Sequence, residues 1–239
     1  MASSDKDCQQ SSDPGPKPDK GSTLAEQVYR RLSAAILAGE LAPGSKISEP
    51  ALARQYGVSR GPLREALHRL QERKLITRSA NQGPRVVKPS TQALAELFVV
   101  REALEGAAAR LAAIHATDAE IALLRATVSE KAANLEAGPA GSAEQDERSD
   151  QDFHLAIAKC SRNPTLIDLL CAELYPLLRL YRGMPPIIRT HGNRAVVEHE
   201  RIVSAIEDHD ADLAEILMRK HIAAARQRRG IAIAGESNG

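Results

Sequence analysis

One stretch of the chain constrains its fold more than any other, from Glu49 to Arg73, which reads EPALARQYGVSRGPLREALHRLQER. Apolar residues at helical spacing on both sides of Gly57 predict a short helix, a sharp turn and a second helix. Ser59 is a candidate N-cap of the second helix, and Pro62 lies in its first turn, where a missing N–H costs little. This arrangement predicts a helix-turn-helix.

The second helix has an apolar face and a basic face. The apolar residues recur at steps of three and four and predict a buried stripe: Leu63, Ala66, Leu67 and Leu70. Arg60, Arg64 and His68 are spaced by four on another face. Arginines near the N-terminus of a recognition helix can bond O6 and N7 of guanine together. The alternative is an ordinary surface helix with solvated arginines, which the flanking segments disfavour.

Two short strands are expected after this helix, at 75–78 and 85–88, joined through a turn at 81–84. A hairpin in this position is a wing, and Arg78 and Arg85 beside its tip are expected to place cations on phosphates or in a minor groove. Before the motif, the capping-box spacing of Thr23 and Glu26 opens a helix that ends at Gly39. Residues 22–89 are therefore expected to form a three-helix winged unit.

Charge is distributed unevenly along the chain. Residues 22–89 hold 12 Lys and Arg against 5 Asp and Glu, whereas residues 90–239 hold 17 against 22. A basic module joined to a mildly acidic one is typical of a DNA-binding domain attached to a sensing or dimerising domain.

The run AILAGELAPGSKISEPALARQYGVSRGPLREALHRLQERKLI resembles the DNA-binding domain of the GntR superfamily of bacterial transcription regulators. This resemblance implies that Arg54, Arg60 and Arg64 contact DNA. It also implies three residues that shape the approach, Ser59, Gly61 and Pro62, and a wing tip at Gly83. The family usually has Glu-Gly where this chain has Arg73-Lys74, which alters the turn into the wing but no groove contact.

From Thr91 onward the pattern predicts helices only. Their expected ranges are 91–115, 118–137, 144–161, 164–182, 187–207 and 210–229. The fold class is therefore mainly α, with an N-terminal winged helix-turn-helix followed by an all-α bundle over 90–229. The segments 1–21 and 230–239 are expected to be disordered tails. Three unpaired cysteines, no apolar run long enough to span a bilayer and no signal peptide predict a cytoplasmic protein.

Polar residues at helical spacing predict a metal site inside the bundle. Asp150 and His154, four apart, lie on one helical face, while His199 and His221 follow apolar stripes on two other helices. Three histidines and an aspartate from three helices suit a Zn-, Ni- or Mn-type site. Any one of these histidines alone is more simply a hydrogen-bonded core residue.

Three further segments, VREALEGAAARLAA, QDFHLAIAKCSRNPTL and VVEHERIVSAIEDHDADLAEILMRKHI, resemble the FCD ligand-binding domain of the FadR-like branch of that superfamily. The resemblance implies a divalent metal held by Asp150, His154, His199 and His221, with a small carboxylate effector completing its coordination. Arg101 is a candidate partner of that carboxylate. Equally, it can pair with Glu105 at the helix surface.

The expected function is a ligand-responsive, homodimeric transcription regulator, with repression favoured, that binds two-fold operator DNA and no membrane. Ligand binding would change the relative position of two winged domains. One alternative is a metal-dependent hydrolase, since an Asp/His site with open positions also activates water, but no general base is evident. A second is a purely structural polar cluster that fixes the register of the bundle.

Overall fold

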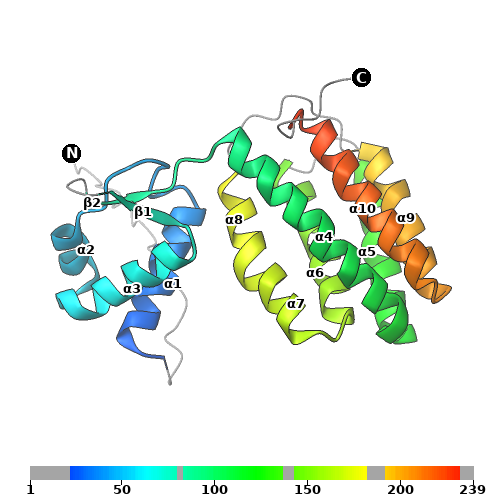
Figure 1. The fold of residues 1–239 in the computed structure, drawn as a ribbon, viewed down its shortest axis with the longest axis horizontal. Helices are drawn as coiled ribbons and strands as arrows, with labels where there is room; N and C mark the ends of the chain where they lie inside the picture. Colours follow the sequence, from blue (N-terminus) through cyan, green and yellow to red (C-terminus); the bar gives the residue numbers. More distant parts are fainter. Residues whose placement is uncertain (1–21, 80–82, 137–142, 182–191, 232–239) are drawn as a thin grey trace, which may run out of the picture.

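The computed structural model describes residues 22–79, 83–136, 143–181 and 192–231. Two units lie side by side, and a short segment joins β2 to α4 (Figure 1). The smaller unit contains α1 (Leu24–Leu37), α2 (Glu49–Tyr56), α3 (Arg60–Glu72), β1 (Ile76–Ser79) and β2 (Gly83–Val86). The larger unit contains α4 (Thr91–His115), α5 (Asp118–Glu136), α6 (Ala143–Cys160), α7 (Pro164–Asp168), η1 (Leu169–Leu174), α8 (Tyr175–Leu180), α9 (Gly192–Glu207) and α10 (Ala211–Arg228). The predicted class, a winged helix-turn-helix followed by a helical bundle, is confirmed.

Local signals in the sequence account for the helix ends of the smaller unit. The Oγ1 atom of Thr23 accepts a hydrogen bond from the backbone N–H of Glu26 at 3.2 Å, as capping-box spacing predicts. Gly57 ends α2 with a φ of 64°, in the left-handed region where a side chain is unfavourable. The apolar stripe of α3 is buried, with Leu63, Ala66, Leu67 and Leu70 at 0% exposure.

The hairpin differs in detail from its prediction. The strands pair antiparallel with Ile76 opposite Val86 and Ser79 opposite Gly83, so Gly83 and Pro84 belong to β2 and not to the turn. Residues 80–82 lie outside the described residues. A bridge between Lys46 and Arg85 adds the segment before α2 to the outer edge of the hairpin. This pairing was not predictable from the sequence, because a single bridge leaves no alternating pattern.

Small residues allow the long helices of the bundle to approach closely. The face of α4 that meets α10 and its neighbours carries buried alanines, namely Ala108, Ala109, Ala112 and Ala113. Gly106 lies on the same helix, and a Cβ atom there would stand 2.6 Å from the Cγ of Arg219 on α10. α4 and α10 therefore pack with almost no space for larger side chains between them.

The helix expected over 164–182 is interrupted. It consists of α7, the π-helical segment η1 and α8. Pro176 explains the interruption, because it has no N–H to donate to the carbonyl of Ala172 four residues earlier. The prediction placed one continuous helix here because the apolar spacing continues through the proline.

The other boundaries agree with the predictions to within a few residues. α9 begins at Gly192, and residues 182–191, which include the predicted start at 187, lie outside the described residues. The expected tails lie outside them too, except for Gly230, which follows α10 with a φ of 63°, and Ile231, which is buried. In the described part of the chain, no helix combines the length and apolar character needed to cross a bilayer.

Candidate functional site

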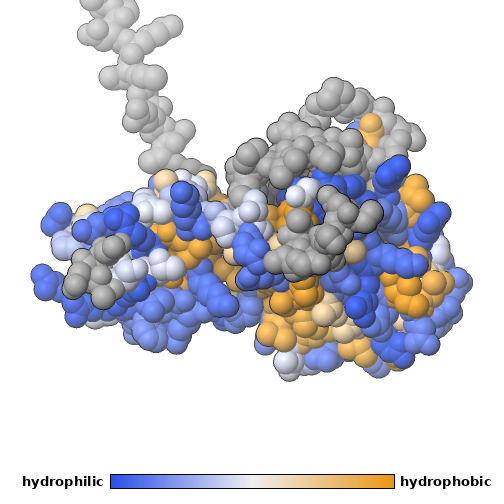
Figure 2. Space-filling model, turned by 45° about the horizontal axis from the view of Figure 1, so that its top comes forward, coloured by the Kyte–Doolittle hydropathy of each residue, from blue (hydrophilic) through white to orange (hydrophobic). Residues whose placement is uncertain are grey.

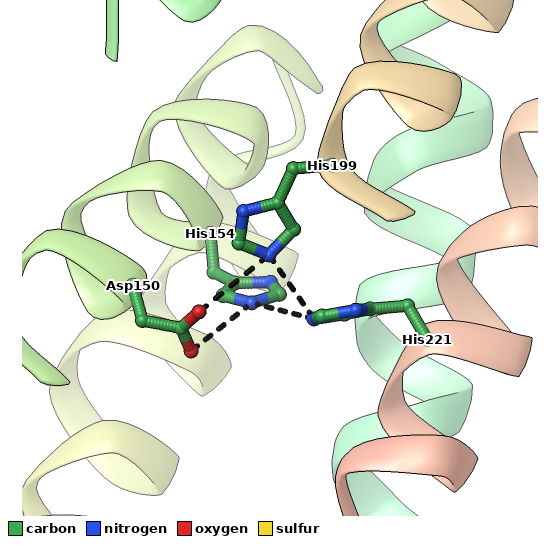
Figure 3. Close-up of side chains that lie close together, drawn as sticks. All are labelled: Asp150, His154, His199 and His221. Atoms are coloured by element: carbon green, nitrogen blue, oxygen red, sulfur yellow. Dashed lines mark hydrogen bonds and ion pairs between the residues drawn. The ribbon is translucent and has the colours of Figure 1, made fainter. Parts of the chain in front are cut away.

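The four residues predicted to hold a metal lie together inside the bundle (Figure 3). Asp150 and His154 come from α6, His199 from α9 and His221 from α10. One ligand atom from each lies within 4.8 Å of those of the other three. All three histidines are buried, at 1%, 0% and 3% exposure, and Asp150 is partly buried. α6 therefore meets two helices, α9 and α10, that come later in the chain and are consecutive in sequence.

The Nε2 atoms of the three imidazoles face a common point. Nε2 of His221 lies 3.2 Å from Nε2 of His199 and 3.3 Å from Nε2 of His154. The Asp150 carboxylate closes the group, with Oδ1 3.5 Å from Nε2 of His199 and Oδ2 3.6 Å from Nε2 of His154. Figure 3 shows the carboxylate opposite the His221 ring across this point.

Two carboxylates outside this group fix the tautomers of two histidines. Nδ1 of His154 lies 2.5 Å from Oε2 of Glu105, and Nδ1 of His221 lies 2.7 Å from Oε2 of Glu198. Arg228 donates to both carboxylate oxygens of Glu198, at 2.7 and 2.8 Å. We assign the proton to Nδ1 of His221, because the Glu198 carboxylate accepts it there. We assign it to Nδ1 of His154 as well, because the charge of Glu105 faces that atom at ion-pair distance, although the two atoms do not have hydrogen-bond geometry. The Nε2 lone pairs of His154 and His221 then point at one another.

His199 is held differently. Its ring stacks on Phe153, with centroids 4.0 Å apart and planes inclined by 20°. Its Nδ1 atom is buried and has no hydrogen-bond partner among the described residues. Packing against Phe153 therefore sets the orientation of this ring, and no carboxylate in the described part of the chain supports its Nδ1 atom as Glu105 and Glu198 do for the other two rings.

This donor set fits a divalent cation. Converging nitrogen lone pairs repel each other, and a carboxylate beside them adds negative charge, so the group is unfavourable unless a cation or protons fill it. Imidazole nitrogen and carboxylate oxygen are ligands that Zn, Ni and Mn accept. Carboxylates on the far side of two histidines are the usual support of metal-binding imidazoles.

The protonation states of Asp150, His199 and His221 agree with metal binding. His154 differs, because burial lowers its pKa but the charge of Glu105 raises it above the ordinary value. Burial lowers the pKa of His199 well below its ordinary value and lowers that of His221 as well, so both rings are neutral donors. Burial would raise the pKa of Asp150, but its bond to His154 and the charge of Lys131, whose Nζ lies 2.7 Å from Oδ1, hold it well below the ordinary value. A charged aspartate and neutral imidazoles are the forms that bind metals.

Arg101 combines features of both predicted roles. Its Nε lies 2.5 Å from Oε1 of Glu105, but this pair is in the interior of the bundle and not at the helix surface, since Arg101 is 8% and Glu105 1% exposed. The Tyr175 hydroxyl donates to the same oxygen at 2.8 Å. Arg101, Tyr175 and Asp150 also line a cavity of about 60 Å³. Arg101 therefore shares this cavity with Asp150, one of the four clustered residues.

Several of the predicted DNA-binding residues lie at the surface of the smaller unit. Arg54 and Arg60 are exposed. Arg64 and Arg78 both pair with Glu49, each at 3.2 Å, so one carboxylate joins the recognition helix to the wing. Arg85 donates to the carbonyl of Gly44 at 3.0 Å.

The first turn of α3 lacks the usual cap. Ser59 occupies the N-cap position, but its side chain makes no cap hydrogen bond. Pro62, the third helical residue, has no N–H to offer it. The first N–H groups of α3, beside Gly61 and exposed arginines, therefore remain available to an anion such as a phosphate.

Comparison with known sequences identifies both units. The family described as bacterial regulatory proteins, gntR family, matches residues 24–86, and the FCD domain matches residues 96–224, which is more than half of the chain. The chain belongs to the gntR family of regulators that carry an FCD domain. It is a transcription regulator, and nothing in these comparisons supports the hydrolase alternative.

Three relatives illustrate this gntR-family membership. The Nta operon transcriptional regulator of Aminobacter aminovorans is 41% identical over 127 residues, but that match covers 52% of this chain and only 58% of the relative. The regulator LutR of Bacillus subtilis (strain 168) is 32% identical over 204 residues, covering 77% of this chain and 91% of LutR. The structure of E. coli McbR/YncC superposes with a TM-score of 0.64 at 25% identity, covering 87% of this chain and 98% of that one.

Sequence reasoning about this gntR-family regulator missed the residues that support the histidines. Glu198 is the neighbour of His199 in sequence and gave no signal, because adjacent helical residues point apart. Lys131 and Tyr175 lie on other elements and reach the site only through packing. Glu105 was expected only as a surface partner of Arg101, although its position among buried alanines indicated an interior carboxylate.

Proposed function

We propose that this regulator binds a divalent metal ion, of the Zn, Ni or Mn type, through Asp150, His154, His199 and His221. One observation carries the proposal: three buried imidazoles aim their Nε2 atoms at one point, with that of His221 within 3.3 Å of the other two, and carboxylates bind two of the rings from behind. A purely structural polar cluster would instead pair each donor with an acceptor. Facing lone pairs are unfavourable unless a cation or a proton lies between them, and a metal ion would meet all four groups at once.

The effector of this regulator is a small organic acid that binds in the cavity beside Arg101. When bound, the metal supplies a Lewis-acidic position for a carboxylate oxygen. Nε of Arg101 is engaged by Glu105, which leaves the terminal N–H groups of its planar guanidinium to orient the acid. Tyr175 fixes the same Glu105 oxygen and so limits the positions that Arg101 can take.

Residues 22–89 form the DNA-binding domain, and residues 90–229 bind the effector and form the dimer. Operator DNA is contacted through the face that carries Arg54, Ser59, Arg60, Gly61, Pro62, Arg64, Gly83 and Arg85. The charge of this domain supports the assignment, with 12 cationic against 5 anionic side chains. Two copies of the domain in a homodimer would meet the two halves of a two-fold operator.

The surface of the bundle supports dimerisation. Most of the large apolar side chains exposed among the described residues belong to the bundle, including Val99 and Val100 on α4 and Leu213 and Ile216 on α10. Figure 2 shows hydrophobic patches on the larger unit, while the visible face of the smaller unit is mostly hydrophilic. The homodimer acts in the cytoplasm as a repressor that its effector releases from DNA.

The metal proposal is tested by purifying the protein without chelator, measuring bound metal, and following the unfolding midpoint with Zn²⁺ and with a panel of carboxylic acids. A ligand that binds only the folded protein raises that midpoint. The double variant His199→Ala, His221→Ala should lose both metal and stabilisation. His68→Ala is the control, since that exposed ring pairs with Glu72 at the surface. Equal metal content in the double variant and the intact protein would overturn the proposal.

The acid panel tests the effector separately. An acid that stabilises the metal-loaded protein but neither the chelator-treated protein nor Arg101→Gln identifies the effector class. If Zn²⁺ stabilises the protein and no acid does, the metal site stands and the proposal of a carboxylate effector is overturned.

A further inference from the structure

An arginine at the end of the recognition helix links the two units. Arg73 is the C-cap of α3, and its Nη1 donates to the backbone carbonyl of Ala172 at 3.0 Å. The same guanidinium pairs with the carboxylate of Glu173. Both partners lie in the π-helical segment η1 of the bundle. Arg73 stands at a position where the resemblance to the superfamily leads one to expect a glutamate.

The carbonyl that Arg73 uses is one that the bundle helix leaves without its α-helical donor. An α-helix would satisfy the oxygen of Ala172 with the N–H of residue 176, but residue 176 is proline. Around this position the backbone bonds join residues five apart, as in the bond from the N–H of Tyr175 to the carbonyl of Leu170. A guanidinium from the other unit therefore takes the place of the missing donor.

The same short segment reaches the effector site. Tyr175 follows η1 directly and is 4% exposed, and its hydroxyl donates to Glu105. Glu105 in turn bonds Arg101, which lines the cavity, and pairs with His154, one of the four residues at the proposed metal site. Less than one helical turn of backbone thus separates the carbonyl held by Arg73 from a side chain that faces the effector cavity.

We propose that Arg73 is a positioning residue that couples the effector site to the recognition helix through the segment from Ala172 to Tyr175. A ligand that draws Arg101 or Glu105 toward itself moves the Glu105 oxygen that accepts the hydrogen bond of the Tyr175 hydroxyl. Because Tyr175 and Ala172 belong to one helical turn, the carbonyl and carboxylate that hold Arg73 move with it. The end of α3 moves with them, and this changes the angle at which the DNA-binding face is presented.

This coupling rests on the proposed metal function, so its test uses Zn²⁺ as the probe and measures bound Zn²⁺ in every sample. The readout is amide hydrogen exchange at the end of α3, where the N–H groups of Arg73, Lys74 and Leu75 bond to Arg69, Gln71 and Leu70. It is measured on the full chain with Zn²⁺ and with chelator. A merely structural role for Arg73 would alter exchange equally in both states.

The variant is Arg73→Gln, and the matched control is Arg125→Gln. Arg125 pairs with Glu207 within the bundle, and the side chains of that pair, at 45% and 48% exposure, resemble those of Arg73 and Glu173 at 36% and 46%. We expect Zn²⁺ to change exchange at these three amides in the wild type and in Arg125→Gln. Arg73→Gln should bind Zn²⁺ normally and lose the change, and Glu173→Gln should reduce it in the same direction.

Two outcomes would overturn the coupling and leave the metal site intact: a wild type that binds Zn²⁺ without any change at the end of α3, or an Arg73→Gln protein that keeps the full change. A wild type that binds no Zn²⁺ would overturn both the coupling and the metal function. The amount of bound Zn²⁺ therefore distinguishes the two failures.

Discussion

Glu105 and His154 form a buried pair in which Oε2 of the carboxylate lies 2.5 Å from Nδ1 of the imidazole. The two residues are only 1% exposed each, and they come from α4 and α6. Burial raises the pKa of Glu105, but Arg101 and His154 outweigh this effect and lower it to about 2. The carboxylate is therefore charged at any physiological pH, and its charge favours a proton on the Nδ1 atom of His154 that faces it.

Replacing this carboxylate should weaken metal binding without removing a ligand. Glu105→Gln keeps the shape but is a poorer acceptor for Nδ1, so Zn²⁺ affinity should fall about 10- to 100-fold, the usual cost of losing such a supporting group. Competition with a chromophoric chelator measures it. Glu102→Gln is the control, because Glu102 lies one turn away and pairs with Arg219 instead. Unchanged affinity in Glu105→Gln would show that the carboxylate does not fix the imidazole.

Glu49 should limit non-specific DNA binding. It neutralises Arg64 of the recognition helix and Arg78 of the wing together. Glu49→Gln removes a negative charge from the DNA-binding face and frees both arginines for phosphates. Affinity for a random-sequence duplex at low salt should rise about threefold or more, with a steeper salt dependence. Fluorescence anisotropy measures it, with Glu130→Gln on α5 as control. Weaker binding by Glu49→Gln would mean that Glu49 positions the arginines for DNA.

Two glycines of the helix-turn-helix should respond oppositely to alanine. Gly57 has a φ of 64°, so Gly57→Ala should lower the free energy of unfolding by about 1 kcal/mol. Gly61 lies inside α3, and a Cβ atom added there would meet no other atom within 4 Å, so Gly61→Ala should raise that free energy by up to about 1 kcal/mol. Urea unfolding distinguishes them. A destabilised Gly61→Ala would contradict the open space at that position.

Acid should weaken the contact between α1 and α3 through Glu26. The bond to Arg69 lowers the pKa of this carboxyl, and Arg30 adds to the effect against a partial burial that raises it. A lowered folded-state pKa stabilises the protein fully above the ordinary value of 4.5, and that stabilisation disappears as the pH falls through the folded-state pKa.

Glu26→Gln should therefore lower stability at pH 7 by about 1 kcal/mol or less, because the pairs are near the surface. The difference from wild type should vanish in acid. Glu65→Gln is the matched control, because it removes an exposed carboxylate from α3. A difference that persists below the folded-state pKa would indicate lost packing and not lost charge.

The order and type of most elements were predictable because their signals are local. Apolar residues at steps of three and four marked α3, and the capping spacing of Thr23 and Glu26 marked the start of α1. Proline within a helical pattern is also a local signal, but the apolar spacing that continues through Pro176 concealed the break there. The strand limits were displaced because a four-residue hairpin contains too few alternating positions to define its ends.

The clustering of Asp150, His154, His199 and His221 was predictable because each lies on the inward face of its own helix, which periodicity reveals one helix at a time. Only tertiary structure decided which groups support them. Glu105 and Glu198 reach His154 and His221 from other helices, and Lys131 reaches Asp150 from a third. The contacts of Arg73 were equally hidden, because its partners lie about 100 residues away and one of them is a backbone oxygen.

The sequence by itself determined the class of each unit, a basic winged helix-turn-helix and a helical bundle with inward histidines. Spacing, capping and charge act over a few residues and are written directly in the chain. The tertiary structure decided where Arg101 lies, which carboxylates orient the imidazoles and how the units touch. Those relationships depend on how helices distant in sequence pack, and packing is set by the sum of many weak contacts that no single stretch contains.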